Sequence, residues 1–208
     1  MARVEWLAVA GPVEPWTALG LVVVEGVIPL FGTGLRFGPA AGFADAIGLT
    51  GWGLSGLDPP VTSIDGVATI AIDPEPPVLV DHPLGAFELD HVVVNTGSLE
   101  RTCAAITAAT GAPLKRVREA GAVRQGFHRL GGLIVEVVER VGQPVDDPAS
   151  LWGLVFNVID LDAAAELLGP DRCGPPRDAV QPGRRIATMR EEVGLGVPVA
   201  LMTPDPRR

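Results

Sequence analysis

Two residues that can carry protons or bind a metal ion, His91 and Glu136, each lie inside a short apolar run of the sequence. Alternation along a strand predicts that His91 shares a face with Leu89 and Val93, and that Glu136 shares a face with its apolar neighbours two residues away. If these two faces meet, the polar pair lies in an apolar cup. That composition is typical of a metal or small-ligand site.

Each of these residues has a second interpretation. His91 either faces a cavity or is satisfied by a backbone carbonyl, as histidines in apolar strands often are. Glu136 either faces solvent or is buried beside a partner, for which His91, Arg118 and Arg129 are the candidates. His128, on the preceding predicted strand, is a third candidate ligand or a residue of the protein surface. Two histidines and a carboxylate would match the ligand set of non-haem iron and manganese enzymes.

The segment 88–140 predicts the element order β-α-β-β-β around these candidates. A strand covers Leu89–Asn95, and Ser98 is a suitable N-cap for a helix over Leu99–Thr110. Gly111 then ends the helix, and three short strands follow. Segment 151–204 repeats this order, with Asp160 as the N-cap and Gly169 as the stop.

The rest of the chain is harder to interpret. Segment 1–73 has the pattern of a divergent βαβββ-like module, and the proline-rich stretch 74–87 is predicted to be an extended linker. A G-x-G-x-x-G string at 51–56 is followed by Asp58 and two prolines rather than a helix, so it predicts a glycine-rich strand and turn, not a dinucleotide site. Arg184, Arg185 and Arg190 either hold an anion or form a charged strand edge, and we favour the edge.

Composition excludes several classes of partner. The net charge of −9 disfavours nucleic acid and an anionic membrane surface, both of which select basic proteins. The two cysteines lie far apart and support neither a disulfide framework nor a zinc knuckle. The acidic N-terminus does not resemble a signal peptide, and long apolar runs are broken by glycine and charge. We therefore expect a cytoplasmic protein.

The paired modules resemble the vicinal oxygen chelate (glyoxalase/bleomycin-resistance/dioxygenase) superfamily. The resemblance rests on the strand start at Leu89–His91, the strand Gly132–Glu136, the helix entry at Asp160–Asp162 and the tail 179–188, which looks like an actinobacterial glyoxalase-like subgroup of unassigned activity. It implies an α+β fold in which tandem βαβββ modules, 88–140 and 151–204, form curled mixed sheets around a cavity. These modules make up a glyoxalase-like domain, 88–204.

In metal-dependent members of this superfamily, ligands come from the first and fourth strands of each module. The resemblance places His91 and Glu136 at these positions of one module, and Gly153 and Ala200 at those of the other. Glycine and alanine cannot bind a metal. We therefore expect either no cofactor or a weakly bound divalent metal held by His91, Glu136 and, if it points inward, His128.

The first hypothesis that these observations support is that the protein is an enzyme. It would be a glyoxalase-like lyase or dioxygenase that acts on a small oxygenated metabolite, with Glu136 as base or ligand and His91 as ligand or proton carrier. The alternative is a non-catalytic protein of the same fold that sequesters a small molecule, as resistance proteins do. A structural role with a vestigial cavity is a third option. The unpaired first module predicts either packing on the main domain or a homodimer.

Overall fold

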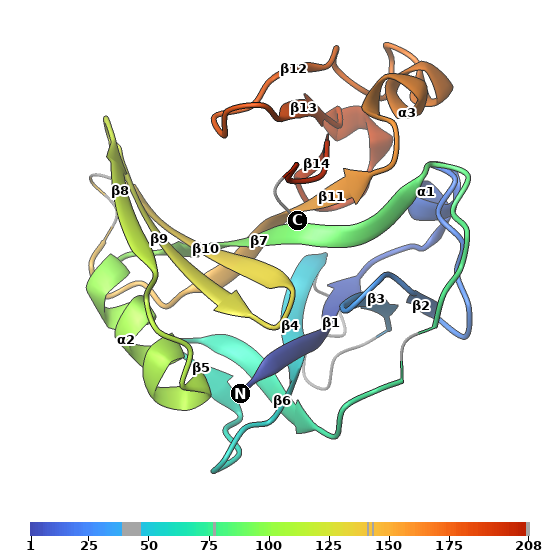
Figure 1. The fold of residues 1–208 in the computed structure, drawn as a ribbon. Helices are drawn as coiled ribbons and strands as arrows, with labels where there is room; N and C mark the ends of the chain where they lie inside the picture. The colour runs from blue at the N-terminus through green and yellow to red at the C-terminus, as the bar shows by residue number, and fades with distance from the viewer. Residues whose placement is uncertain (39–46, 77, 141, 143, 207–208) are drawn as a thin grey trace.

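A computed structural model describes residues 1–38, 47–76, 78–140, 142 and 144–206 of the chain. The strands form two mixed sheets that pack against each other (Figure 1). The C-terminal sheet contains β7 (Ala86–Thr96), β8 (Arg116–Ala120), β9 (Val123–Leu130), β10 (Leu133–Arg140), β11 (Ser150–Val158), β12 (Arg177–Asp178), β13 (Arg185–Thr188) and β14 (Val199–Met202). Its strand order is β12-β13-β14-β11-β7-β10-β9-β8.

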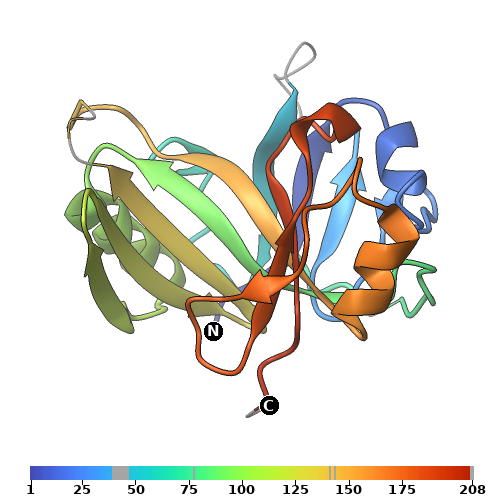
Figure 2. The same ribbon diagram turned by 90° about the horizontal axis from the view of Figure 1, so that it is seen from above.

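This sheet consists of two βαβββ modules. The first is β7, α2 (Leu99–Thr110), β8, β9 and β10, and the second is β11, α3 (Leu161–Leu168), β12, β13 and β14. The first strands of the modules, β7 and β11, pair antiparallel at the centre, and each pairs in parallel with the last strand of its own module. Figure 2 shows the two modules on either side of this central pair. The expected α+β fold of tandem modules is confirmed.

Capping explains where both helices begin and end. The Ser98 side chain accepts a hydrogen bond from the backbone N–H of Arg101 at 3.3 Å, and the Asp160 carboxylate accepts two at the start of α3. Gly111 and Gly169 follow the last helical residues with φ of 69° and 73°, which glycine adopts without steric cost. All four boundaries agree with the sequence prediction.

One irregularity in β7 is important for the site. His91 pairs with Val155 of β11 and Leu89 pairs with the next residue, Phe156, so Asp90 is an extra residue in the ladder. Such a bulge changes the direction of the side chains around it. As a result Leu89 lies in the core with Val92, whereas His91 faces the other side of the sheet. The expectation that His91 and Leu89 share a face is therefore wrong.

The N-terminal sheet contains β1 (Arg3–Ala10), β2 (Val27–Ile28), β3 (Gly34–Phe37), β4 (Gly48–Ser55), β5 (Ser63–Ile64) and β6 (Val67–Ile72), in the order β2-β3-β1-β4-β6-β5. A short helix, α1 (Glu14–Thr17), follows β1. The central strands β1 and β4 pair antiparallel, and β3 and β6 flank them in parallel. This repeats the plan of the C-terminal sheet with shorter connections, a detail that the sequence pattern did not reveal. The G-x-G-x-x-G string lies mostly in β4, as expected.

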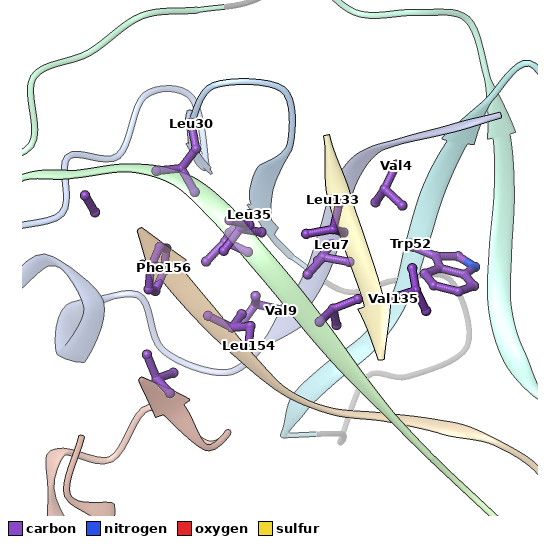
Figure 3. Packing of buried hydrophobic residues seen from close by; sticks show 14 of the residues in the cluster. Val4, Leu7, Val9, Leu30, Leu35, Trp52, Leu133, Val135, Leu154 and Phe156 are labelled. Atoms are coloured by element: carbon purple, nitrogen blue, oxygen red, sulfur yellow. The ribbon is translucent and has the colours of Figure 1, made fainter. Parts of the chain in front are cut away.

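The hydrophobic core lies between the two sheets. Val4, Leu7, Val9 and Trp52 of the N-terminal sheet meet Leu133, Val135, Leu154 and Phe156 of the C-terminal sheet (Figure 3). The apolar face of the first segment is thus covered within the chain. The other face of the C-terminal sheet is left to form a site.

The stretch between the sheets, from residue 73 to residue 85, has no regular strand or helix in its described part. It is nevertheless held in place by His82, which is buried and bridges two loops of the N-terminal segment. His82 Nδ1 accepts from the backbone N–H of Val22 at 2.9 Å, and its Nε2 lies 2.8 Å from the carbonyl oxygen of Pro29. Within the described ranges, neither the length nor the apolar content of any helix is enough to cross a bilayer.

Candidate functional site

A cavity of about 640 Å³ lies on the face of the C-terminal sheet that points away from the core. Strands of both modules and the segment after β12 enclose it. Its lining residues are His91, Arg116, Arg118, Gln125, Phe127, Glu136, Arg177, Asp178, Ala179, Val180, Gln181, Pro182, Ile186 and Met202. The volume suits a small organic ligand. His91 and Glu136, the two residues singled out from the sequence, both face it.

The structure brings His91 and Glu136 together. The strands β7 and β10 are parallel neighbours, with Ile134 opposite His91 and Glu136 opposite Val93. His91 Nε2 lies 3.6 Å from Glu136 Oε2, and each side chain is 14% exposed. This separation is too long for a strong hydrogen bond. The two groups therefore flank a position that a reacting atom of a ligand can reach.

Asp90 fixes the orientation of His91. Because of the bulge, the Asp90 carboxylate lies beside its neighbour, with Oδ2 2.8 Å from His91 Nδ1. With the proton on Nδ1 donated to this carboxylate, Nε2 is left to face Glu136. Burial of Asp90 raises its pKa, but hydrogen bonds from His91 and Arg184 outweigh this effect and hold the pKa well below its usual range. Asp90 is therefore a permanent anion behind the imidazole.

A buried ion pair supports Asp90 from the second module. Arg184 Nη2 donates to Asp90 Oδ1 at 2.8 Å and to Asn157 Oδ1 at 2.7 Å, and both charged side chains are at most 3% exposed. The remaining donors of Arg184 bond to Gln181 and to the carbonyl oxygen of Thr203. A guanidinium is costly to bury unless its donors are satisfied, and these partners meet that requirement. The ion pair ties the segment that covers the cavity to the residue that orients His91.

Glu136 has a partner of its own. Gln125 Nε2, on the neighbouring strand β9, donates to Glu136 Oε1 at 2.5 Å. This bond leaves Oε2, the oxygen nearer His91, directed toward the cavity. The oxygen of the Gln125 amide, Oε1, is buried and has no hydrogen-bond partner. Glu136 is thus held by a neutral donor, which fixes its position without neutralising its charge.

His128 does not join this pair. On β9, Gln125 and Phe127 line the cavity, and His128 lies on the opposite face with Gly126, under α2. Its Nδ1 lies 3.1 Å from the carbonyl oxygen of Ala112, and its Nε2 is buried without a partner. Burial lowers the pKa of His128. Of the three candidate ligands, His91 and Glu136 therefore face the cavity and His128 does not.

The second module presents an apolar surface to the same cavity. Val155, opposite His91, forms a small buried cluster with Ala200 and Met202, against which Ala179 and Ile186 pack. Gly153 and Ala200, the positions at which the resemblance implied two further ligands, have no donor atom in their side chains. The described residues include no group of three or more His, Cys, Asp or Glu that could hold a metal ion. The donor set does not fit a tightly bound divalent ion.

Other reactive groups lie outside the cavity. Cys103 is buried in α2, where burial and the nearby Glu100 raise its pKa to about 11, and Cys173 is also buried. Arg185 pairs with Asp162 on the exposed surface, and Arg190 donates to the carbonyl oxygen of Pro170. Neither arginine lines the cavity. The interpretation of these two residues as surface charges agrees with their contacts.

The N-terminal sheet contains a counterpart of this site. In β1, Val4 pairs with Leu54 and Trp6 pairs with Gly53, so Glu5 is an extra residue, as Asp90 is in β7. Ser55 Oγ donates to Glu5 Oε1 at 2.5 Å, as Asn157 donates to Asp90.

The ring residue after the bulge differs between the two sheets. Trp6 takes the place of His91, and Arg36 on β3 takes the place of Glu136 by register. The Arg36 guanidinium lies 5.0 Å from the centre of the Trp6 ring, a cation–π contact. The indole lies against Gly53, where any side chain would clash with it. At equivalent backbone positions, the N-terminal sheet thus has two side chains that pack against each other, and the C-terminal sheet has a His–Glu pair beside a cavity.

Sequence reasoning missed Asp90, Gln125 and Asn157, and its expectation that Arg184 belongs to a charged strand edge is wrong, because Arg184 is buried against Asp90. A signal existed for Asp90, since two successive polar residues inside an apolar strand break the alternation, as a bulge does. The other three side chains reach the site from separate strands and loops, and nothing in their local sequence indicates it.

No family model matches the sequence, and no curated protein matches it. Among solved structures, a mutant of 4-hydroxymandelate synthase from Streptomyces coelicolor matches with a TM-score of 0.69 and 15% identity, covering 99% of this chain and 93% of that chain. Methylmalonyl-CoA epimerase from Mycobacterium tuberculosis matches with a TM-score of 0.49 and 18% identity, over 59% of this chain and 91% of that chain.

The match to 4-hydroxymandelate synthase extends over both sheets, so the two-sheet arrangement is shared along with the C-terminal modules. At this level of identity it is the fold that is shared. The chain therefore shares the fold of 4-hydroxymandelate synthase, and this fold is the α+β arrangement of tandem modules expected from the sequence.

Proposed function

We propose that the cavity binds a small oxygenated metabolite and that Glu136 and His91 move a proton on it. The observation that carries this proposal is the placement of His91 Nε2 3.6 Å from Glu136 Oε2, with both groups facing a cavity of about 640 Å³. The reaction class that suits this pair is removal of a proton from a carbon next to a carbonyl group.

Each residue has a distinct role in the proposed step. Glu136 Oε2 accepts the proton as the C–H bond breaks, and the electron pair of that bond moves into an enolate. His91, protonated on Nε2, donates that proton to the developing oxyanion, and Asp90 stabilises the charged ring. Return of the proton from Glu136 to the carbon, with the enol proton going back to His91, restores the substrate, and exchange of that proton with solvent before its return labels the carbon. Atoms and charge balance without an added reactant.

Comparison of the two sheets supports a functional role for the pair. The fold does not need His91 and Glu136, because the matching positions of the N-terminal sheet hold Trp6 and Arg36 and the strands pair in the same way. A buried tryptophan packs more apolar surface than a histidine. Two ionisable side chains in this position therefore favour chemistry over packing.

The proposal can be tested by solvent deuterium exchange. Small carbonyl compounds with an acidic α C–H, such as 2-oxoacids, 2-hydroxyketones and α-branched thioesters, are incubated with the protein in D2O, and loss of the α-proton signal is followed by proton NMR. We expect Glu136→Gln to slow the exchange by about 10²-fold or more, as loss of a general base does. Glu166→Gln removes the same charge from the exposed side of α3 and should have no effect.

A second candidate function is binding without turnover, as in a sequestering protein. The apolar lining residues Val180, Ile186 and Met202 support it, because this part of the cavity offers packing to a ligand and no reactive group. Compounds that bind in the exchange experiment without losing their α-proton would favour this function over the first. Exchange that is equal in the wild type and Glu136→Gln would refute the role of Glu136. The cytoplasmic location and a homodimer remain predictions, the latter for light scattering to check.

A further inference from the structure

We propose that the mouth of the cavity binds an anionic group of the ligand through Arg116 and Arg118 of β8, with Arg177 of β12 as a third cation. The ligand class is then a small organic carboxylate or phosphate ester with an apolar part. This proposal rests on the proposed function for the claim that the ligand is a substrate. The anion site itself can be tested by binding alone.

The strand geometry directs Arg116 and Arg118 to the cavity. They are two residues apart on β8, so their side chains leave the same face. Arg116 pairs with Phe127 and Arg118 with Gln125, and both partners also line the cavity. The Arg116 guanidinium lies 4.9 Å from the centre of the Phe127 ring. This contact holds the guanidinium beside the opening.

These arginines lack the close acidic partners that five other arginines have in the described part of the chain. Within the described residues, the five arginines Arg36, Arg101, Arg124, Arg184 and Arg185 each lie within 3 Å of a carboxylate oxygen, whereas no ion pair involves Arg116, Arg118 or Arg177. The chain has 25 acidic and 16 basic residues, so acidic partners are abundant. Three cations that gather unpaired around one cavity favour an anion from outside the chain.

The cavity also contains two carboxylates, Glu136 and Asp178. Glu136 is held by Gln125, and Asp178 lies on β12 opposite Arg185. Three arginines outnumber these two groups, and β8 carries no carboxylate that faces the cavity. The excess of positive charge therefore lies at the β8 side of the opening.

The spacing of the strands sets the size of the ligand. The strand β9 separates β8 from β10, and Phe127 pairs with both Arg116 and Glu136, so the backbones of Arg116 and Glu136 are about 10 Å apart. An arginine side chain spans much of this distance, which leaves room for a few bonds between the anion and the reacting carbon. On the other side of the cavity the lining residues Ile186 and Met202 receive an apolar part. A planar guanidinium fork suits carboxylate and phosphate oxygens equally.

Isothermal titration calorimetry on the full chain tests this proposal with three probes of similar shape: phenylacetate, phenyl phosphate and the neutral phenylacetamide. We expect both anions to bind and the amide to bind at least tenfold more weakly. Arg118→Gln and Arg116→Gln should each weaken anion binding about tenfold, the usual loss for a hydrogen bond to a charged group. Arg185→Gln removes an equal charge from the surface ion pair with Asp162 and should change nothing.

The same titrations separate this proposal from the proposed function. Glu136→Gln should keep anion binding while it loses α-proton exchange. If exchange is absent with every compound but the anion preference holds, the cavity binds acids without catalysis and the anion site stands. The relative affinities of phenylacetate and phenyl phosphate assign the natural group to one class. Equal affinity for the amide, unchanged affinity in both arginine variants, or no anion binding up to about 10 mM would each overturn the anion site.

Discussion

Asp90 and His91 are adjacent in the chain, and yet their side chains meet on one side of β7, with Asp90 Oδ2 2.8 Å from His91 Nδ1. Adjacent residues of a regular strand point to opposite faces and cannot do this. The bulge at Asp90 makes the contact available, and Arg184 and Asn157 hold the carboxylate from the second module. The orientation of the imidazole thus depends on both halves of the sheet.

Removal of one partner of the buried Asp90–Arg184 ion pair is expected to destabilise the protein strongly. Arg184→Met leaves the Asp90 carboxylate buried and without its strongest partner, so we expect the free energy of unfolding at pH 7 to fall by about 3–5 kcal/mol. Urea denaturation followed by circular dichroism measures this change.

The double variant Asp90→Asn/Arg184→Met provides the control for this prediction, because it removes both charges. We expect it to be more stable than Arg184→Met alone. A double variant that is less stable than the single one would show that the uncompensated charge of Asp90 is not the cause of the loss.

Because His128 is buried, we expect the folded protein to lose stability in acid. Burial lowers its pKa in the folded state, whereas the unfolded chain has the ordinary value near ~6.5. The unfolded state therefore binds more protons below this pH, and stability decreases as the pH falls from about 6.5 toward the folded pKa, by at most about 1.4 kcal/mol per pH unit. Asn at this position can still donate to Ala112 but does not titrate. The stability difference between wild type and His128→Asn should thus shift in favour of the variant as the pH falls from 8 to 5, which denaturation curves at each pH measure.

Metal affinity is predicted to depend on the missing donors of the second module. Val155 pairs with His91 across the two central strands and belongs to the cluster against which the cavity-lining Ile186 packs, so Val155→His adds a third donor beside His91 and Glu136. Because three protein ligands suffice for many zinc sites, we expect the affinity for Zn²⁺ to rise at least tenfold. Competition with a colorimetric chelator gives this value, and the wild type should bind Zn²⁺ only weakly.

Adding Glu136→Gln to Val155→His removes one of the three donors and should cancel the gain. If the gain persists in that variant, the ion binds elsewhere. Tight Zn²⁺ binding by the wild type after dialysis would contradict the view that two donors are insufficient.

The sequence predicted the parts of this molecule that local chemistry determines. Capping residues such as Ser98 and Asp160 act within a few residues of their own position, so both helices were placed correctly. Alternation placed Glu136 on one face with Ile134 and Val138 but left open whether that face is buried. The expectation that His91 and Glu136 share a cavity rested on alternation and on the resemblance, and the two side chains lie 3.6 Å apart.

Other features depend on contacts between distant segments, and alternation alone could not supply them. Arg184 reaches Asp90 across 94 positions of the chain, and no pattern near either residue indicates the pair. His128 was considered as a ligand because it is a histidine on the right strand, but its parity along β9 places it under α2. The anion site was missed because Arg116 and Arg118 resemble the charges of any exposed edge strand.

The matching bulges at Glu5 and Asp90 have a historical consequence. An extra residue at the same step of the central strand, bearing a carboxylate and bonded to a polar side chain on the antiparallel neighbour, is improbable as two independent accidents. It is the expected result of an ancestral gene duplication. In the N-terminal copy the equivalent positions hold Trp6 and Arg36, which pack against each other. In the C-terminal copy they hold the His91–Glu136 pair beside the cavity.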